Sequence, residues 1–172
     1  MRWMWIDRIV EYEPERFMAA IKNVSLAEEH LHDHFPACGS DEALPLMPAS
    51  LMIEGMAQTA GILVGTVSRF REKVILAKVG AARFERDVFP GQTIRYEAHL
   101  ERFDPAGALT KGVILCLKHP ALEWQEIGQV ELMFSHIDQN MSGIKFPEEN
   151  FVFSENFRTI LRTAGLLELV DE

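Results

Sequence analysis

The sequence predicts an α+β fold in which an antiparallel sheet wraps around one long central helix. Two short strand-like segments come first, an apolar helical segment follows, and four further strand-like segments come after it. The segment at 93–103 alternates apolar and polar side chains, which is typical of a strand between a core and water. The segment at 51–70 is apolar on nearly every side, which indicates a helix enclosed by protein. A sheet that packs one face on that helix satisfies this order of elements.

The segments before the helix are short. Residues 6–12 and 17–26 are predicted strands, and Glu13-Pro14-Glu15 supplies the turn between them. Residues 27–43 follow as an acidic, histidine-bearing stretch with several small and turn-forming residues. We expect a loop there.

The central helix is predicted from its boundaries as well as its composition. Pro48 directly precedes it, and Ser50 is the predicted N-cap. At about 1.5 Å per residue, the segment would extend about 30 Å. Three glycines lower its helix propensity, so we expect another backbone to approach there: Gly55, Gly61 and Gly65.

Four predicted strands follow the helix, at residues 74–84, 93–103, 109–117 and 124–137. Phe89-Pro90-Gly91 places proline and glycine as a type II turn prefers them. A polar linker at 138–150 then leads to a short amphipathic helix that starts at Ser154 and has its apolar face on Phe157, Ile160, Leu161 and Ala164. We therefore predict one domain at 1–137, and at 138–172 a linker and helix that pack on the same domain or on a partner.

The composition narrows the classes of function. The 172 residues carry a net charge of −9, which argues against non-specific binding to nucleic acid or to anionic membranes. The two cysteines, Cys38 and Cys116, are too few for a disulfide framework and suit a reducing cytoplasm. The apolar stretch at 46–67 is long enough to span a membrane, but Glu54 and Gln58 lie inside it. We expect a cytoplasmic protein with no membrane span and a buried central helix.

Glu54 is the residue that the apolar helix does not explain. A carboxylate there reaches solvent at the first helical turn, is neutralised by a hydrogen bond in the core, or has a chemical task. Gln58 lies one helical turn later, so it shares a face with Glu54 and would orient the carboxyl group. A glutamic acid held in apolar surroundings is suited to act as a general acid. The proline-rich segment before the helix returns the chain to the helix start. His34 is therefore a candidate for the matching base.

The histidines allow another interpretation. His30, His32 and His34 alternate, so on a strand they would share a face and could bind one metal ion. No further carboxylate or histidine motif completes such a site, and Pro36 indicates that the segment leaves extended structure. We therefore predict no metal site. A loop histidine without a task is the remaining alternative for His34.

Most of the chain resembles the β-hydroxyacyl-acyl carrier protein dehydratases of fatty acid synthesis, which have the hot dog fold. The resemblance covers residues 6–137, and its motifs occur in order. They are Asp7-Arg8-Ile9, Ala20-Ile21-Lys22-Asn23-Val24, His34-Phe35-Pro36, Leu46-Met47-Pro48, Ile53-Glu54-Gly55-Met56-Ala57-Gln58, Ala82-Arg83-Phe84, Pro90-Gly91 and Glu131-Leu132-Met133-Phe134.

The resemblance implies roles for matching residues. The family's catalytic histidine falls on His34 and its catalytic carboxylate on Glu54. These groups face each other across a homodimer, so each site is shared. The backbone N–H that binds the thioester oxygen falls at Ala49, and a helix N-terminus suits that task. We expect three further residues at the site: Ala37 beside the thioester, and Gln58 and Leu46 as supporting residues. No cofactor is implied.

The sequence departs from the family at three places. Glycine follows both the His-Phe-Pro and the Met-Pro motif in the family, but this chain has Ala37 and Ala49. The loop between Pro36 and Pro45 is longer than usual, which would form a lid, change the accepted chain length or displace His34. Residues 138–172 have no counterpart in the common short enzymes.

Basic residues are concentrated between positions 69 and 86, where there are six Arg and Lys residues and only two Glu residues. They are either solvated charges at the ends of elements or a landing patch for an acidic carrier protein or coenzyme A. The candidates are Arg69, Arg71, Lys73, Arg83 and Arg86.

The resemblance implies a lyase that dehydrates a (3R)-3-hydroxyacyl thioester, on acyl carrier protein or coenzyme A, to a trans-2-enoyl thioester. The enzymatic alternative is a hot dog thioesterase or isomerase. The other alternative is a non-catalytic protein that binds acyl thioesters.

Overall fold

The computed structural model describes residues 4–118, 120, 122–137 and 155–170. These residues form one antiparallel sheet of six strands in the order β1-β2-β4-β5-β6-β3. The strands are β1 Arg8–Glu13, β2 Phe17–Asn23, β3 Lys73–Phe84, β4 Thr93–Asp104, β5 Gly107–Lys118 and β6 Glu123–Ile137. The helices are α1 Glu29–Asp33, α2 Ala49–Val67 and α3 Glu155–Thr163, followed by a short 3₁₀ turn η1 Leu167–Leu169.

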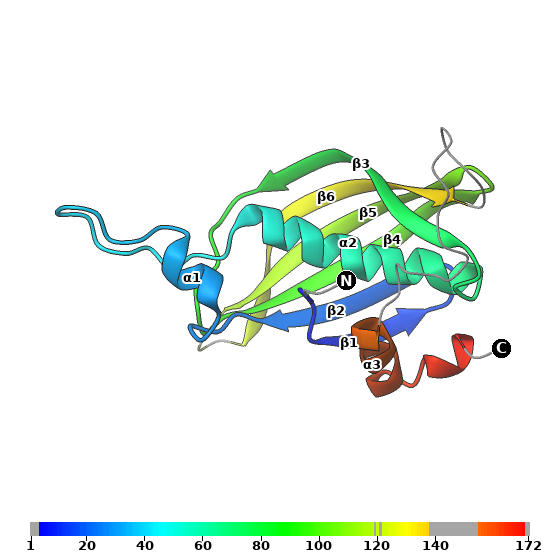
Figure 1. Ribbon diagram of the computed structural model, residues 1–172, viewed down its shortest axis with the longest axis horizontal. Helices are drawn as coiled ribbons and strands as arrows, with labels where there is room; N and C mark the ends of the chain where they lie inside the picture. Colours follow the sequence, from blue (N-terminus) through cyan, green and yellow to red (C-terminus); the bar gives the residue numbers. More distant parts are fainter. Residues whose placement is uncertain (1–3, 119, 121, 138–154, 171–172) are drawn as a thin grey trace.

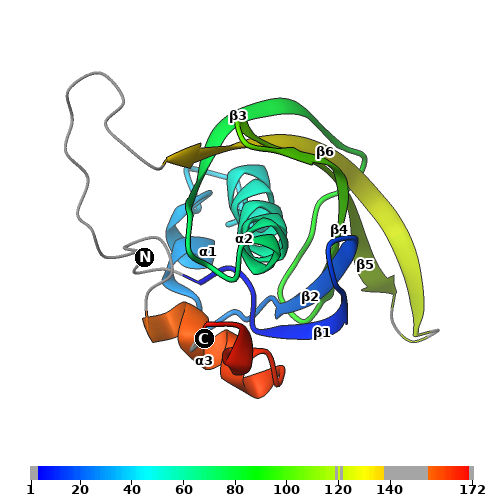
Figure 2. The ribbon, with the colours of Figure 1, turned by 90° about the vertical axis from the view of Figure 1, so that its right-hand side faces the viewer.

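The sheet curls around α2, which lies along its concave face (Figures 1 and 2). Helix α2 packs against the sheet, and several of its residues are fully buried, among them Met56, Ile62 and Leu63. In β4, Ile94, Tyr96 and Ala98 are buried, while the residues between them are more exposed. The predicted α+β architecture and the alternation of this strand are confirmed. Helix α2 is long and apolar enough to cross a membrane by length and composition, but most of it is buried inside this protein.

The ends of α2 differ from the prediction. The helix starts at Ala49 with Pro48 as its N-cap, so the prediction of Ser50 as N-cap was wrong. The carbonyl of Pro48 already accepts the N–H groups of Leu51 and Met52, which places Ser50 inside the first turn. The helix ends at Val67, a few residues early, because Arg69 and the following residue take left-handed conformations with φ of 52° and 57°.

The glycines of α2 have different surroundings. A Cβ on Gly55 would lie 2.4 Å from Cζ of Tyr96, so the helix reaches the sheet there only because this residue has no side chain. The neighbour is thus a side chain and not the backbone that we expected. At Gly61 the nearest atom, in the ring of Phe134, would be 3.5 Å away, which is an ordinary contact.

The stretch between β2 and α2 contains a helix that the sequence did not predict. Helix α1 occupies part of the expected loop, and residues 35–46, here called the arm, extend beyond it. The arm turns back on itself: the N–H of Leu44 donates to the carbonyl of Phe35 at 3.0 Å, and Cys38 and Asp41 form a β-bridge. Figure 1 shows the arm projecting from the body at the end where α1 and the start of α2 lie.

The predicted C-terminal helix is α3, and it packs on β1. Its residues Phe157, Ile160 and Leu161 are buried, as its amphipathic pattern predicts. Figure 2 shows α3 beside β1, outside the curled sheet. Ser154 and the linker at 138–150 lie outside the described residues. The division into domains stays a prediction.

Tyr96 supplies a prediction about stability. Its hydroxyl group is buried without a hydrogen-bond partner among the described residues, and burial raises its pKa. An unpaired buried hydroxyl costs free energy, so Tyr96→Phe should raise the free energy of unfolding by about 1 kcal/mol. Urea denaturation of both proteins measures this difference. A clear loss of stability in the variant would show that the hydroxyl has a partner in solution.

Candidate active site

Glu54 lies near the start of α2 and is half-buried. Its carboxylate Oε1 accepts a hydrogen bond of 2.9 Å from the side-chain amide of Gln58, as the spacing of the two residues predicts. Gln58 is itself buried, and its carbonyl oxygen accepts the backbone N–H of Trp5 at 2.8 Å. The amide of Gln58 is thus fixed at its oxygen, which leaves its nitrogen to orient the carboxyl group of Glu54.

His34 is exposed and lies at the bend after α1. Its backbone N–H donates to the carbonyl of His30 at 3.2 Å, and its imidazole packs edge-on against the ring of Phe35. Among the described residues of one chain, no hydrogen bond or ion pair joins His34 to Glu54. One chain therefore presents each group but does not pair them.

The start of α2 is open. Ala49 is its first residue and is exposed, and no side chain caps this end. The free N–H groups of a first helical turn and the positive end of the helix dipole are available there. Leu46, beside this end, is half-buried, and the next residue, Met47, donates its N–H to the carbonyl of Val88 at 2.8 Å. The segment before the helix is therefore anchored to the body.

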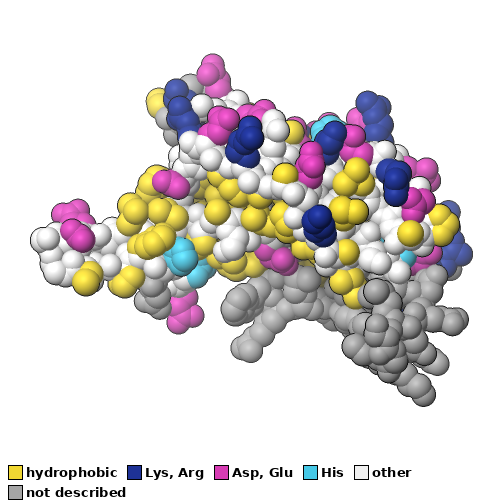
Figure 3. Space-filling view, turned by 90° about the horizontal axis from the view of Figure 1, so that it is seen from above, with side chains coloured by type: hydrophobic (Ala, Val, Ile, Leu, Met, Phe, Trp, Pro, Cys, Tyr) yellow, Lys and Arg dark blue, Asp and Glu magenta, His cyan; other side chains and the backbone are white. Residues whose placement is uncertain are grey.

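Ala37 lies on the arm and is exposed. The arm also exposes two large apolar side chains, Phe35 and Leu44. Figure 3 shows hydrophobic side chains gathered around the base of the arm. The extended loop therefore leaves apolar groups beside His34 without cover from the described part of the chain.

The five candidate carrier-binding residues form two groups. Arg69, Arg71 and Lys73 lie where α2 ends and β3 begins, whereas Arg83 and Arg86 lie at the other end of β3 and after it. The 12-residue strand β3, which would measure about 40 Å if it were straight, lies between the two groups. One chain does not bring them together, although the second group shares the end of the molecule where α2 starts (Figure 1).

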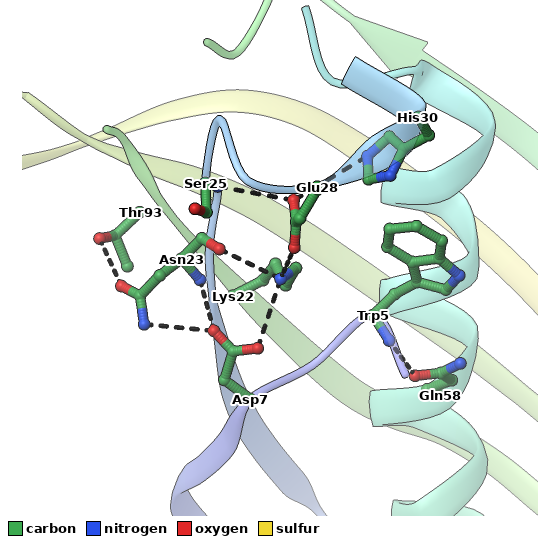
Figure 4. A network of polar contacts seen from close by, with 9 residues as sticks. All are labelled: Trp5, Asp7, Lys22, Asn23, Ser25, Glu28, His30, Gln58 and Thr93. Carbon is green, nitrogen blue, oxygen red and sulfur yellow. Dashed lines mark hydrogen bonds and ion pairs between the residues drawn. The ribbon is translucent and has the colours of Figure 1, made fainter. Parts of the chain in front are cut away.

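A polar cluster next to the site was missed from the sequence. The ammonium group of Lys22 is buried and contacts the carboxylates of Asp7, at 3.4 Å, and Glu28. Asp7 also accepts the backbone N–H of Asn23 at 2.7 Å, and Asn23 in turn accepts the hydroxyl of Thr93 at 2.9 Å (Figure 4). Asp7 and Lys22 belong to two motifs of the family resemblance, but nothing in the sequence indicates that their side chains are in contact.

The alternating histidines are not on a strand. His30 and His32 belong to α1, and among the described residues no group of three histidine, cysteine or acidic residues is arranged to hold a metal ion. Cys116 is buried in β5, where burial raises its pKa, and Cys38 is exposed on the arm. Residues two apart share a face on a strand but not on a helix. The metal interpretation of these histidines therefore loses its basis.

His30 makes the stability depend on pH. Burial lowers its pKa from the ordinary value of 6.5, and the charge of Glu28 only partly opposes this effect. The unfolded chain then binds a proton more readily than the folded chain, so the contribution of a neutral His30 is lost as pH falls below 6.5. The melting temperature of the parent should therefore fall more steeply between pH 7.5 and pH 5.5 than that of His30→Phe. Parallel curves would contradict this.

A groove of about 450 Å3 lies between β1 and the end of α3. Its walls include Tyr12, Thr163 and Leu166, and none of its residues comes from α1 or α2. It is thus separate from Glu54 and His34.

Comparison with known proteins identifies the family of this chain. A family model described as a FabA-like domain matches residues 2–117, which include His34 and Glu54. This chain belongs to the FabA-like family. Its relatives include the 3-hydroxyacyl-[acyl-carrier-protein] dehydratase FabZ of Listeria welshimeri, which is 31% identical over 137 residues, covering 79% of this chain and 87% of the relative. The enzyme of the same name from Polynucleobacter necessarius is 36% identical over 106 residues, covering 61% of this chain and 66% of the relative.

Solved structures agree on the fold. The dehydratase heterocomplex ApeI:P from Xenorhabdus doucetiae matches with a TM-score of 0.58 at 16% identity, covering 79% of this chain and 84% of the other. An acyl-CoA hydrolase mutant from Staphylococcus aureus, in complex with coenzyme A, matches with a TM-score of 0.55 at 14% identity, covering 88% and 87%. The chain has the hot dog fold, and the predicted resemblance to the dehydratases is confirmed.

Proposed function

We propose that this protein removes water from a (3R)-3-hydroxyacyl thioester carried on acyl carrier protein, giving the trans-2-enoyl thioester during fatty acid synthesis in the cytoplasm. The observation that carries this proposal is the Glu54–Gln58 hydrogen bond in a FabA-like domain that also retains His34. Members with 31–36% identity are named as dehydratases acting on this carrier.

The chemistry requires a base, an acid and a group that stabilises negative charge. His34 takes the proton from C2 of the substrate, and the electron pair forms the double bond as the C3–O bond breaks. Glu54 gives its proton to the departing hydroxyl, which leaves as water. The N–H of Ala49 donates to the thioester oxygen, where negative charge develops when the C2 proton is lost. These steps need no redox or metal cofactor.

The two groups require a second subunit, because one chain does not pair them. Strand β3 lies at an edge of the sheet, so one row of its N–H and C=O groups has no strand partner among the described residues. It also exposes Leu76 and Val79, at 36% and 40%. We infer a homodimer in which two β3 strands pair edge to edge about a twofold axis, and His34 of one subunit meets Glu54 of the other.

This arrangement also bears on the carrier protein. If two β3 strands pair in antiparallel orientation, the start of one strand lies beside the end of the other. Arg83 and Arg86 of one subunit then come near the first basic group of its partner. Such a combined surface suits an acidic carrier or the phosphates of coenzyme A.

The direct test is an activity assay. Purified protein is incubated with a 3-hydroxyacyl carrier-protein thioester, and the absorbance of the conjugated enoyl product is followed with time. We expect turnover by the parent and none above background by Glu54→Gln. Release of free thiol instead of enoyl product would indicate a thioesterase. Binding without turnover would indicate an acyl-thioester-binding protein and refute the proposal.

A further inference from the structure

Trp5 contacts α2, which carries Glu54, and α1, which directly precedes His34. Its indole ring packs edge-on against the imidazole of His30 on α1, with ring centroids 4.9 Å apart and an interplanar angle of 82°. Its backbone N–H donates to the side-chain oxygen of Gln58 on α2 at 2.8 Å. Figure 4 shows Trp5 between these two side chains. Trp5 is only 9% exposed and Gln58 is buried, whereas His30 is partly buried.

Each contact leads on to a catalytic group. On one side, the carbonyl of His30 accepts the N–H of His34, at 3.2 Å. On the other side, the amide nitrogen of Gln58 donates to Glu54 at 2.9 Å. A continuous path of contacts therefore runs from the base of the arm through Trp5 to the carboxyl group on α2.

The polar cluster around the buried Lys22 holds two parts of this path, α1 and the segment of Trp5. Glu28, the N-cap residue of α1, contacts the ammonium group of Lys22. Asp7, two residues after Trp5, contacts the same ammonium group and the N–H of Asn23. The cluster thus fixes α1 and the segment of Trp5 relative to the same strand, β2 (Figure 4).

We propose that Trp5 is a positioning residue, which holds the amide of Gln58, and through it the carboxyl group of Glu54, in a fixed position relative to α1 of the same chain. In the proposed dimer this carboxyl group then meets His34 of the partner subunit. The proposal rests on the proposed function for the roles of His34 and Glu54. The imidazole of His30 supports this role as a packing group, because its burial favours the neutral form. Trp5 does not touch the substrate, and its effect passes through Gln58.

Kinetic analysis tests this role with three variants of the full chain. Trp5→Ala removes the ring contact with His30 but keeps the backbone N–H, Trp5→Phe keeps an aromatic ring, and Gln58→Met removes the amide. Trp124→Ala is the control, because Trp124 is 42% exposed on β6. We expect Trp5→Ala to lower kcat about 10-fold with little change in KM, because small displacements of a reacting group are costly. Trp5→Phe should retain most of the parental kcat.

Non-additivity decides whether Trp5 acts through Gln58. If the two residues form one path, Trp5→Ala combined with Gln58→Met should be no slower than Gln58→Met alone. Losses that multiply would overturn the proposal, and so would an unchanged kcat in a folded Trp5→Ala protein.

A measurement without turnover separates this proposal from the proposed function. The side-chain amide signals of Gln58 are assigned in an NMR spectrum by their loss in Gln58→Met, and the carboxyl carbon of Glu54 by its change in Glu54→Gln. Both should shift in Trp5→Ala and in His30→Ala, and neither in Trp124→Ala. Unmoved signals would overturn the path through Trp5. If the signals shift in these variants but the parent has no dehydratase activity, the proposed function is refuted and the path through Trp5 is still supported.

Discussion

His34→Ala should lower kcat for dehydration by about 10²–10⁴-fold, the usual contribution of a general acid or base. His34 is exposed, and it makes a backbone hydrogen bond to His30 and a ring contact with Phe35. Removal of the imidazole therefore leaves the backbone bond and the buried core intact. The assay of enoyl absorbance measures the loss, and the melting temperature checks that the variant is folded.

The matched control for this variant is His99→Ala. His99 is an exposed histidine on β4, where its ring contacts Phe17. Its loss should leave kcat within about twofold of the parent, as expected for a surface residue outside the site. If His34→Ala kept activity close to that of His99→Ala, the assignment of His34 as the base would be wrong.

Gly55→Ala should be strongly destabilising, although alanine normally favours a helix. The new Cβ would lie 2.4 Å from Cζ and 2.5 Å from Oη of the fully buried Tyr96. Neither the ring nor the helix can move without disturbing the core between α2 and β4, and overpacking of this kind costs about 1–3 kcal/mol or more. We expect a fall in the melting temperature of about 2–12 °C for a domain of this size.

Gly61→Ala is the control, because it lies on the same helix and its Cβ would meet only an ordinary contact at 3.5 Å. Helix propensity should stabilise this variant by up to about 1 kcal/mol. The two substitutions make the same chemical change with opposite expected signs. Equal effects of the two would contradict the close packing of Gly55 on Tyr96.

The parts of the fold that follow from local patterns were predicted well. Alternation along β4 and the apolar character of α2 identified the sheet and the central helix, and the turn at Phe89-Pro90-Gly91 has the φ of 87° at Gly91 that a type II turn requires. Helix α1 was missed because its five residues are too few for a hydrophobic period. The N-cap was misplaced because the carbonyl of Pro48, and not a side chain of Ser50, begins the helix.

The candidate site shows a different limit. The hydrogen bond between Glu54 and Gln58 could be predicted, because both residues lie one turn apart on a single helix. The bond from Trp5 to Gln58 could not, because it joins positions that are 53 residues apart and uses a backbone N–H. Sequence spacing reports on contacts within an element, whereas contacts between elements depend on how the elements pack.

The most direct test of a site shared between two subunits is to mix two inactive variants. His34→Ala and Glu54→Gln are each purified, unfolded together and refolded, so that mixed dimers form. Each mixed dimer has one site with both defects and one intact site, so random pairing restores about a quarter of the parental activity. We expect this recovery. Activity that stays at the level of the separate variants, although mixed dimers are detected, would contradict it.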